Sequence, residues 1–164
     1  MNTDRFSLPL VYAGQAQKEM TVNEAMARID LLLGATVDSF GLDTPPSAPA
    51  LGQCWIVGSS PTGDWTDHAG AVAGWTAGGW RFVVPRAGLT VWVVDQGLWA
   101  AHNGSIWVVG VMTAQSVMID GDQVLSHQQS AISDPNGGSV IDSEARDKIV
   151  QLLNALREHG LISP

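Results

Sequence analysis

The sequence has few charged residues: Asp, Glu, Lys and Arg make up 15% of it, whereas about 25% is usual for a soluble domain. The charges are mostly acidic, with 16 acidic residues against 8 basic ones and a net charge of −8. Nucleic-acid binding needs basic stripes that neutralise phosphates, and docking on anionic lipid needs basic clusters. The composition therefore predicts neither partner. A surface this poor in charge indicates that part of it is buried against other protein copies.

Cysteine and long apolar runs are also scarce. The single cysteine, Cys54, excludes an intrachain disulfide and a Cys-based zinc site. It lies in the run Cys-Trp-Ile-Val, where we expect a small buried hydrophobe. The N-terminal residues lack a signal-peptide pattern, and no run reaches transmembrane length. We therefore expect no membrane insertion, and a chain that stays in the cytoplasm unless it is carried out as part of something larger.

Catalytic motifs are missing as well. The sequence contains no Gly-rich phosphate loop, no nucleophile elbow and no paired-His metal motif. One loop holds Asp64, Asp67 and His68, but no comparable cluster elsewhere could complete a metal site, so we interpret it as a polar loop with Trp65 folded onto the sheet. The sequence thus predicts a protein that is not an enzyme, with no catalytic residue, no metal and no cofactor.

Tryptophan, by contrast, is abundant and clustered. Five of the seven Trp residues lie between Ala71 and Gly110, among short Val-rich runs split by glycine-containing turns. Aromatic and β-branched runs bounded by turn residues are typical of a small antiparallel sheet. Asn103-Gly104 favours a tight type I′ turn, which needs positive φ at both central residues. We expect strands at Gln53–Gly58, Trp80–Val84, Val91–Asp95, Leu98–His102 and Ser105–Gly110.

A first helix is predicted from Thr21 to Gly34. Thr21 and Glu24 fit a capping box, and Gly34 suits the left-handed position that ends a helix. The polar residues Asn23, Glu24, Arg28 and Asp30 are consistent with either a solvated face or a contact surface. The apolar residues recur at helical spacing and should pack on the sheet: Val22, Ala25, Met26, Ile29, Leu32 and Leu33.

The chain changes character after Gly110. Val117–Ile119 and Val124–Ser126 flank Asp120-Gly121, which is a second hairpin signal. A link containing Pro and Gly follows at residues 131–139.

A second helix is predicted over Asp142–His159. Asp142 is a good N-cap, and Gly160 is placed for the C′ position of a Schellman motif. One interpretation is a helix packed on its own domain. The other is a self-associating helix in a symmetric bundle, because apolar residues four, three and four apart are typical of oligomeric coiled coils. The stripe that would form this oligomer interface is Ala145, Ile149, Leu152, Leu153 and Leu156.

Together these elements predict an α+β protein in two parts. Residues 1–110 form a Trp-rich antiparallel β meander or barrel with an N-terminal helix. Residues 111–164 form a C-terminal β-hairpin, a linker and an oligomerisation or attachment helix. Most Trp residues should fill the core, but an exposed indole can stack on the apolar face of a sugar. Trp65 and Trp99 are therefore the candidate glycan-binding residues.

Two segments resemble known families. Residues 6–110 resemble a domain family of unknown function from structural proteins of alphaproteobacterial prophages and gene transfer agents. Residues 131–162 resemble a C-terminal module of the same kinds of protein. The residues that carry the first resemblance are Leu8, Pro9, Gly14, Gln15, Ala16, Gln17, Lys18, Asn23, Glu24, Ala25, Asp30, Trp55, Gly63, Trp65, His68, Ala69, Gly70, Trp75, Gly79, Trp80, Pro85, Gly88, Trp92 and Trp107.

The resemblance implies a virion structural protein of a phage-like particle, assembled in the bacterial cytoplasm. It implies a head-spike or tail-fibre component that attaches the host-adsorption apparatus. A base or adaptor is expected rather than a receptor-binding tip, because many relatives continue with further domains. The expected partners are other copies of the chain, as a trimer or pentamer, and capsid vertex, spike or fibre proteins. The alternative is a carbohydrate-binding module that recognises host capsular polysaccharide through exposed Trp.

Overall fold

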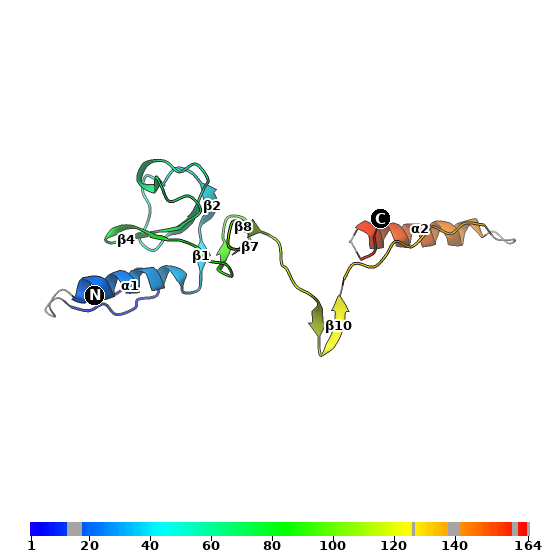
Figure 1. Cartoon of the computed structure of the whole chain (residues 1–164), viewed down its shortest axis with the longest axis horizontal. Helices are drawn as coiled ribbons and strands as arrows, with labels where there is room; N and C mark the ends of the chain where they lie inside the picture. Colours follow the sequence, from blue (N-terminus) through cyan, green and yellow to red (C-terminus); the bar gives the residue numbers. More distant parts are fainter. Residues whose placement is uncertain (13–17, 126, 138–141, 159–160, 164) are drawn as a thin grey trace. The chain divides into compact units, whose positions relative to one another are not determined.

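The computed structural model describes residues 1–12, 18–125, 127–137, 142–158 and 161–163. The chain divides into unit 1, Met1–Val111, and unit 2, Met112–Pro164 (Figure 1). Several sequence-based expectations lie outside the described residues: Gly14–Gln17 of the N-terminal motif, Ser126 of the expected strand, residues 138–139 of the link, and His159 and Gly160.

Unit 1 contains one α-helix and two four-stranded sheets among its described residues. The strand orders are β1-β6-β7-β8 and β2-β3-β4-β5. The elements are α1 (Lys18–Leu32), β1 (Thr36–Val37), β2 (Ser39–Leu42), β3 (Cys54–Val57), the 3-10 turn η1 (Gly63–Trp65), β4 (Val72–Thr76), β5 (Gly79–Val83), β6 (Thr90–Val93), β7 (Leu98–His102) and β8 (Trp107–Val109). The predicted α+β class is confirmed. The described strands close no barrel.

The expected single meander is wrong, because β5 and β6 belong to different sheets. Two strands that the sequence did not indicate, β1 and β2, pair in parallel with β6 and β3. Between them lies Asp38, whose carboxylate accepts the Cys54 N–H at 3.0 Å and the Gln53 side-chain amide at 3.2 Å. The segment 36–42 therefore joins the two sheets.

Strand β3 is buried on both faces. Because side chains alternate along a strand, Cys54 and Ile56 point into one cluster and Trp55 and Val57 into another. The first cluster also contains Leu31, Val37, Val72, Val91, Val93 and Ala100. The second contains Trp65 and Ala73, with Trp75, Trp80 and Phe82 packed against it. A strand covered on both faces explains the continuous apolar run Cys-Trp-Ile-Val.

Helix α1 contradicts two expectations. It begins by Lys18, so Thr21 lies within it and no capping box forms there. Its buried residues are Asp30 and Leu31, whereas Ile29, Leu32 and Leu33 of the predicted apolar face are exposed. Beside Leu31, which enters the core, the polar residues Asp30 and Asn23 make contacts, because the N-terminal segment presents backbone N–H groups that need acceptors. Gly34 has φ of +52° just beyond the helix, as expected for a left-handed C′ residue.

The two predicted hairpin turns have different outcomes. At Asn103-Gly104 only the glycine has positive φ, so the type I′ prediction is wrong. Asn103 instead accepts the N–H groups of Ser105 and Ile106 with its side-chain oxygen, which lengthens the loop and delays β8 to Trp107. At Asp120-Gly121 both residues have positive φ, 51° and 91°, as a type I′ turn requires.

Unit 2 contains the hairpin of β9 (Val117–Ile119) and β10 (Asp122–Leu125), followed by α2 (Ser143–Glu158). The predicted N-cap is confirmed, since the Asp142 carboxylate accepts the Ala145 N–H at 2.9 Å. Beyond the helix, the Leu161 N–H donates to the Leu156 carbonyl at 2.9 Å, which is the six-to-one bond of a Schellman motif.

Candidate functional surfaces

The first candidate glycan-binding residue, Trp65, is completely buried, with 0% exposure. Its ring lies 6.1 Å from that of Trp55 and 5.2 Å from that of Trp80, centroid to centroid, in tilted and edge-to-face arrangements. The loop that carries it is folded onto the sheet, as predicted, with His68 stacked on Phe82 at 3.6 Å. Neither face of the Trp65 indole is accessible to a sugar, so its assignment as a glycan platform is wrong.

The second candidate, Trp99, is 53% exposed on β7. It lies directly opposite Trp92 of β6, and the two rings form an edge-to-face pair at 5.2 Å. This cross-strand contact fixes the Trp99 ring while leaving much of it in solvent. Trp92 carries the family resemblance but was not a glycan candidate from the sequence, because only the pairing register places it beside Trp99. Of the two candidate glycan-binding residues, Trp99 is therefore the one that stays accessible to a sugar.

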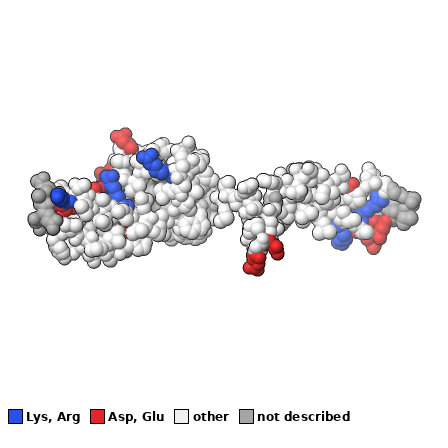
Figure 2. Space-filling model, turned by 60° about the horizontal axis from the view of Figure 1, so that its bottom comes forward, with Lys and Arg blue, Asp and Glu red and all other residues white. Residues whose placement is uncertain are grey.

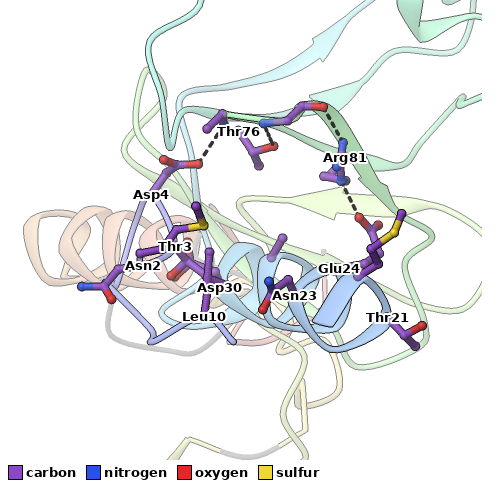
Figure 3. A pocket seen from close by; sticks show the side chains of 15 residues that line it. Asn2, Thr3, Asp4, Leu10, Thr21, Asn23, Glu24, Asp30, Thr76 and Arg81 are labelled. Carbon is purple, nitrogen blue, oxygen red and sulfur yellow. Dashed lines mark hydrogen bonds and ion pairs between the residues drawn. The ribbon is translucent and has the colours of Figure 1, made fainter. Parts of the chain in front are cut away.

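A groove of about 770 Å³ lies between the N-terminal residues, α1 and the β4–β5 turn (Figure 3). Its carboxylates are engaged in bonds within the chain: Asp30 accepts the N–H groups of Arg5 and Phe6, both at 2.8 Å, and Asp4 accepts that of Ala77 at 3.0 Å. Glu24 accepts from Arg81 Nε at 2.6 Å, as Figure 3 shows. These bonds join segments that are distant in sequence, so the groove marks a packing contact between the N-terminal residues, α1 and the β4–β5 hairpin; it is called the seam below.

Asn23 and Glu24, two residues that carry the family resemblance, act in this seam. Asn23 exchanges two hydrogen bonds with the backbone of Val11, at 2.8 and 3.0 Å. Burial alone would raise the pKa of the Glu24 carboxyl, but hydrogen bonds and charge from Arg28 and Arg81 outweigh it and hold that pKa below its usual value. These residues therefore hold the N-terminal segment and β5 against α1, which is a structural role.

A second groove, of about 690 Å³, lies over the ends of both sheets and contains His102 and Trp107. His102 is buried, and its Nδ1 accepts the Gly104 N–H at 3.2 Å. The Trp107 indole donates to the Gly70 carbonyl at 2.8 Å, which ties the two sheets together. Sequence reasoning missed this groove, because its lining comes from several separate segments between Phe40 and Trp107.

The predicted stripe on α2 is divided. Leu153 is 7% exposed and Leu156 is partly buried, whereas Ala145, Ile149 and Leu152 are exposed. Ile149 and Leu152 are 45% and 65% exposed, and a step of three residues places them on one helix face. Leu153 and Leu156 pack inside the unit, which fits a helix packed on its own domain. The rest of the stripe faces solvent, which fits a self-associating helix.

The described residues provide little reactive chemistry. No three His, Cys, Asp or Glu side chains among them gather as a metal-binding group. None of the helices in the described ranges is long and apolar enough to cross a membrane. Cys54 is 1% exposed; burial, as the main cause, raises the pKa of its thiol to about 11. The Cys54 thiol is therefore kept protonated and unreactive at neutral pH.

The pKa of Cys54 predicts a loss of stability at alkaline pH. The ordinary value is 9.0 and the folded value is about 11, so the stabilisation is complete below pH 9 and is lost as pH rises to about 11. The total loss is roughly 3 kcal/mol in the free energy of unfolding. Urea unfolding at pH 8 and pH 11 measures it, with Cys54→Ala as the control. A drop of equal size in that variant would contradict the assignment to Cys54.

Comparison with known protein families places this geometry in context. The family described as Protein of unknown function (DUF2793) matches residues 22–108, which is just over half of the chain. The chain therefore belongs to this family. The match runs from α1 to β8, so it spans the helix, both sheets and the buried Trp cluster. A search of curated proteins finds no match.

Proposed function

We propose that this protein is a virion structural component of a phage-like particle or gene transfer agent. In this role it is a homo-oligomeric head-spike or tail-fibre base or adaptor that attaches the host-adsorption apparatus. Unit 1 acts as a rigid body, and unit 2 acts as the assembly element. The expected partners are other copies, as a trimer or pentamer, together with capsid vertex, spike or fibre proteins.

The observation that carries the proposal is the uncovered apolar surface of unit 2. Ile149 and Leu152 of α2 and all residues of β9 and β10 are exposed. Isolated two-stranded hairpins are marginal in water, and short helices depend on packing. A further support is the scarcity of charge, since most of the surface visible in Figure 2 is neither acidic nor basic. The resemblance to phage-like structural proteins supplies the setting.

Solution mass tests the proposal. The intact chain, of 17.3 kDa, should form a trimer or pentamer by light scattering. A chain ending at Val111 keeps unit 1, which has its own cores, and should be a monomer. Threefold stoichiometry would favour a fibre and fivefold stoichiometry a capsid vertex. An intact chain that stays monomeric at high concentration would contradict the proposal.

A variant in α2 makes the test more specific. Leu152→Asp places a charge on the exposed stripe and should lower the oligomer mass to that of the monomer. Asn154→Asp adds the same charge at an exposed position outside the predicted stripe, and should leave the mass unchanged.

The Trp92–Trp99 pair favours a second candidate function, binding of host surface polysaccharide. Trp99→Ala should then weaken binding of capsular polysaccharide about tenfold, because a stacked ring contributes about 1.5 kcal/mol. Tryptophan fluorescence during titration measures the affinity. Leu98→Ala, an exposed neighbour at 42%, is the control. A spectrum of the intact protein that does not change at saturating polysaccharide would eliminate this candidate.

A further inference from the structure

The β9–β10 hairpin has the composition of an interface rather than of a solvent-exposed turn. Val117, Met118 and Ile119 of β9 are 39%, 55% and 57% exposed, and Val124 and Leu125 of β10 are 49% and 47% exposed. Exposed apolar side chains on so short a hairpin give it no core of its own. Figure 1 shows the hairpin as a pair of short strands, with β10 labelled.

The edges of this hairpin are unprotected. β9 and β10 form a two-stranded sheet, so each strand has one side without a neighbouring strand among the residues that the structure describes. Natural edge strands are usually blocked by Lys, Pro or a covering element, because free N–H and C=O groups recruit other strands. The sequence from Val117 to Leu125, Val-Met-Ile-Asp-Gly-Asp-Gln-Val-Leu, contains no Lys, Arg or Pro. Apart from the register shift between Gln123 and Leu125 and the two Asp residues at the turn, these edges lack the features that usually block pairing with another strand.

The two faces of the hairpin differ. Val117 is opposite Leu125, and Ile119 is opposite Asp122, so these four residues share one face. Met118 is opposite Gln123 on the other face, and the register shifts between Gln123 and Leu125. The first face is therefore apolar except near the turn, where Asp122 lies. Only that face provides a continuous apolar surface for burial.

We propose that β9–β10 is a strand-addition site whose occupant is the same hairpin of another copy of this chain. Rotation about an axis parallel to the strands brings β10 of one copy beside β9 of the next. The pairing remains antiparallel across the contact, because it repeats the relation of the two strands inside one copy. Repeating this head-to-tail contact closes a ring in which every edge is paired and the apolar part of the face, Val117, Ile119 and Leu125, is buried inside, while Asp122 of each copy lies at the turn end of the ring.

The chemistry of the hairpin selects this occupant. Free backbone edges are satisfied by another strand edge, which polysaccharide and lipid do not present. The only charges in the hairpin, Asp120 and Asp122, are acidic and disfavour nucleic acid and anionic membranes. The inference rests on the proposed assembly function, because it assumes that copies of the chain meet through unit 2.

Two neighbouring substitutions in the full chain test the proposal. Ile119→Asp and Met118→Asp change residues of nearly equal exposure, 57% and 55%, that point to opposite faces. Ile119→Asp should reduce the light-scattering mass to 17.3 kDa, whereas Met118→Asp should keep the wild-type mass. Amide hydrogen exchange over residues 117–125 should be slow in the wild-type oligomer and fast in Ile119→Asp. Unchanged tryptophan fluorescence confirms that unit 1 remains folded in both variants.

The outcomes separate this inference from the proposed function. If the wild-type protein is an oligomer but the two variants do not show these different masses, the hairpin assignment is overturned. Equal masses for Ile119→Asp and Met118→Asp are one such result. Assembly through α2 then remains in place. In that case Leu152→Asp alone should still dissociate the oligomer. A monomeric wild-type protein overturns both proposals.

Discussion

Replacement of Trp65 by alanine is expected to lower the free energy of unfolding by about 3–5 kcal/mol, the range for deleting a large buried aromatic side chain. Trp65 is 0% exposed, and its ring contacts those of Trp55 and Trp80. The edge-to-face contact with Trp80 adds about 0.5–1.5 kcal/mol beyond the buried area. Urea unfolding monitored by circular dichroism measures the loss, as a lower midpoint denaturant concentration.

Trp99→Ala is the matched control, because it removes the same side chain from a position that is 53% exposed. Its loss should be about 1 kcal/mol or less. Trp65→Phe should fall between the two, since it leaves a smaller cavity and removes an indole N–H that has no hydrogen-bond partner among the described residues. Equal losses for the two alanine variants would contradict the buried position of Trp65.

The features that the sequence predicted correctly depend on neighbouring residues. The Asp142 cap involves residues three apart, and the Asp120-Gly121 turn depends on two residues that tolerate positive φ. Strands β3 and β7 were found for a similar reason, since aromatic and β-branched runs favour extended backbone wherever the chain leads next. In each case the determining interaction lies within one element or one turn.

Helix α1 shows why such local rules fail. Its apolar residues recur at helical spacing, and the usual inference is that this face is buried. Leu31 packs on β4, but α1 also contacts the N-terminal residues, whose backbone N–H groups are satisfied by Asp30 and Asn23. Arg5 and Asp30 are 25 residues apart, so no spacing pattern reveals the contact. Ile29 and Leu32 of the predicted apolar face are therefore exposed, beside polar residues such as Thr21 and Arg28.

The candidate site was predicted only in part, for a related reason. Trp65 and Trp99 both looked like aromatic residues in or beside turns, and the sequence offered no means to separate them. Trp65 is buried because β3, β4 and β5 present Trp55, Ala73 and Trp80 on the same face of one sheet. Trp99 is exposed because its partner across the strands, Trp92, covers only part of the ring. Sheet register decides both cases.

Replacement of Gly74 by alanine is expected to destabilise unit 1 by about 1–3 kcal/mol through overpacking. Gly74 lies in β4, and a Cβ atom there would be 2.2 Å from Leu31 Cδ2 and 2.9 Å from Leu31 Cδ1. Leu31 is 2% exposed in the core, so its side chain must move within a packed environment, or α1 must shift, to make room. The φ of Gly74 is not in the left-handed region, so the effect comes from space rather than from backbone strain.

A double-mutant cycle identifies this contact directly. Leu31→Ala alone should cost about 2–5 kcal/mol, because it leaves a cavity between α1 and β4. In the Leu31→Ala background, Gly74→Ala should be neutral or slightly stabilising, since the new methyl group enters that cavity and alanine restricts the unfolded chain. The resulting coupling of about 1–3 kcal/mol is measurable by urea unfolding of the four proteins. Additive losses would mean that α1 does not rest on Gly74. The polar contacts of Asn23, Glu24 and Asp30 would then have to hold the helix on unit 1 without that packing.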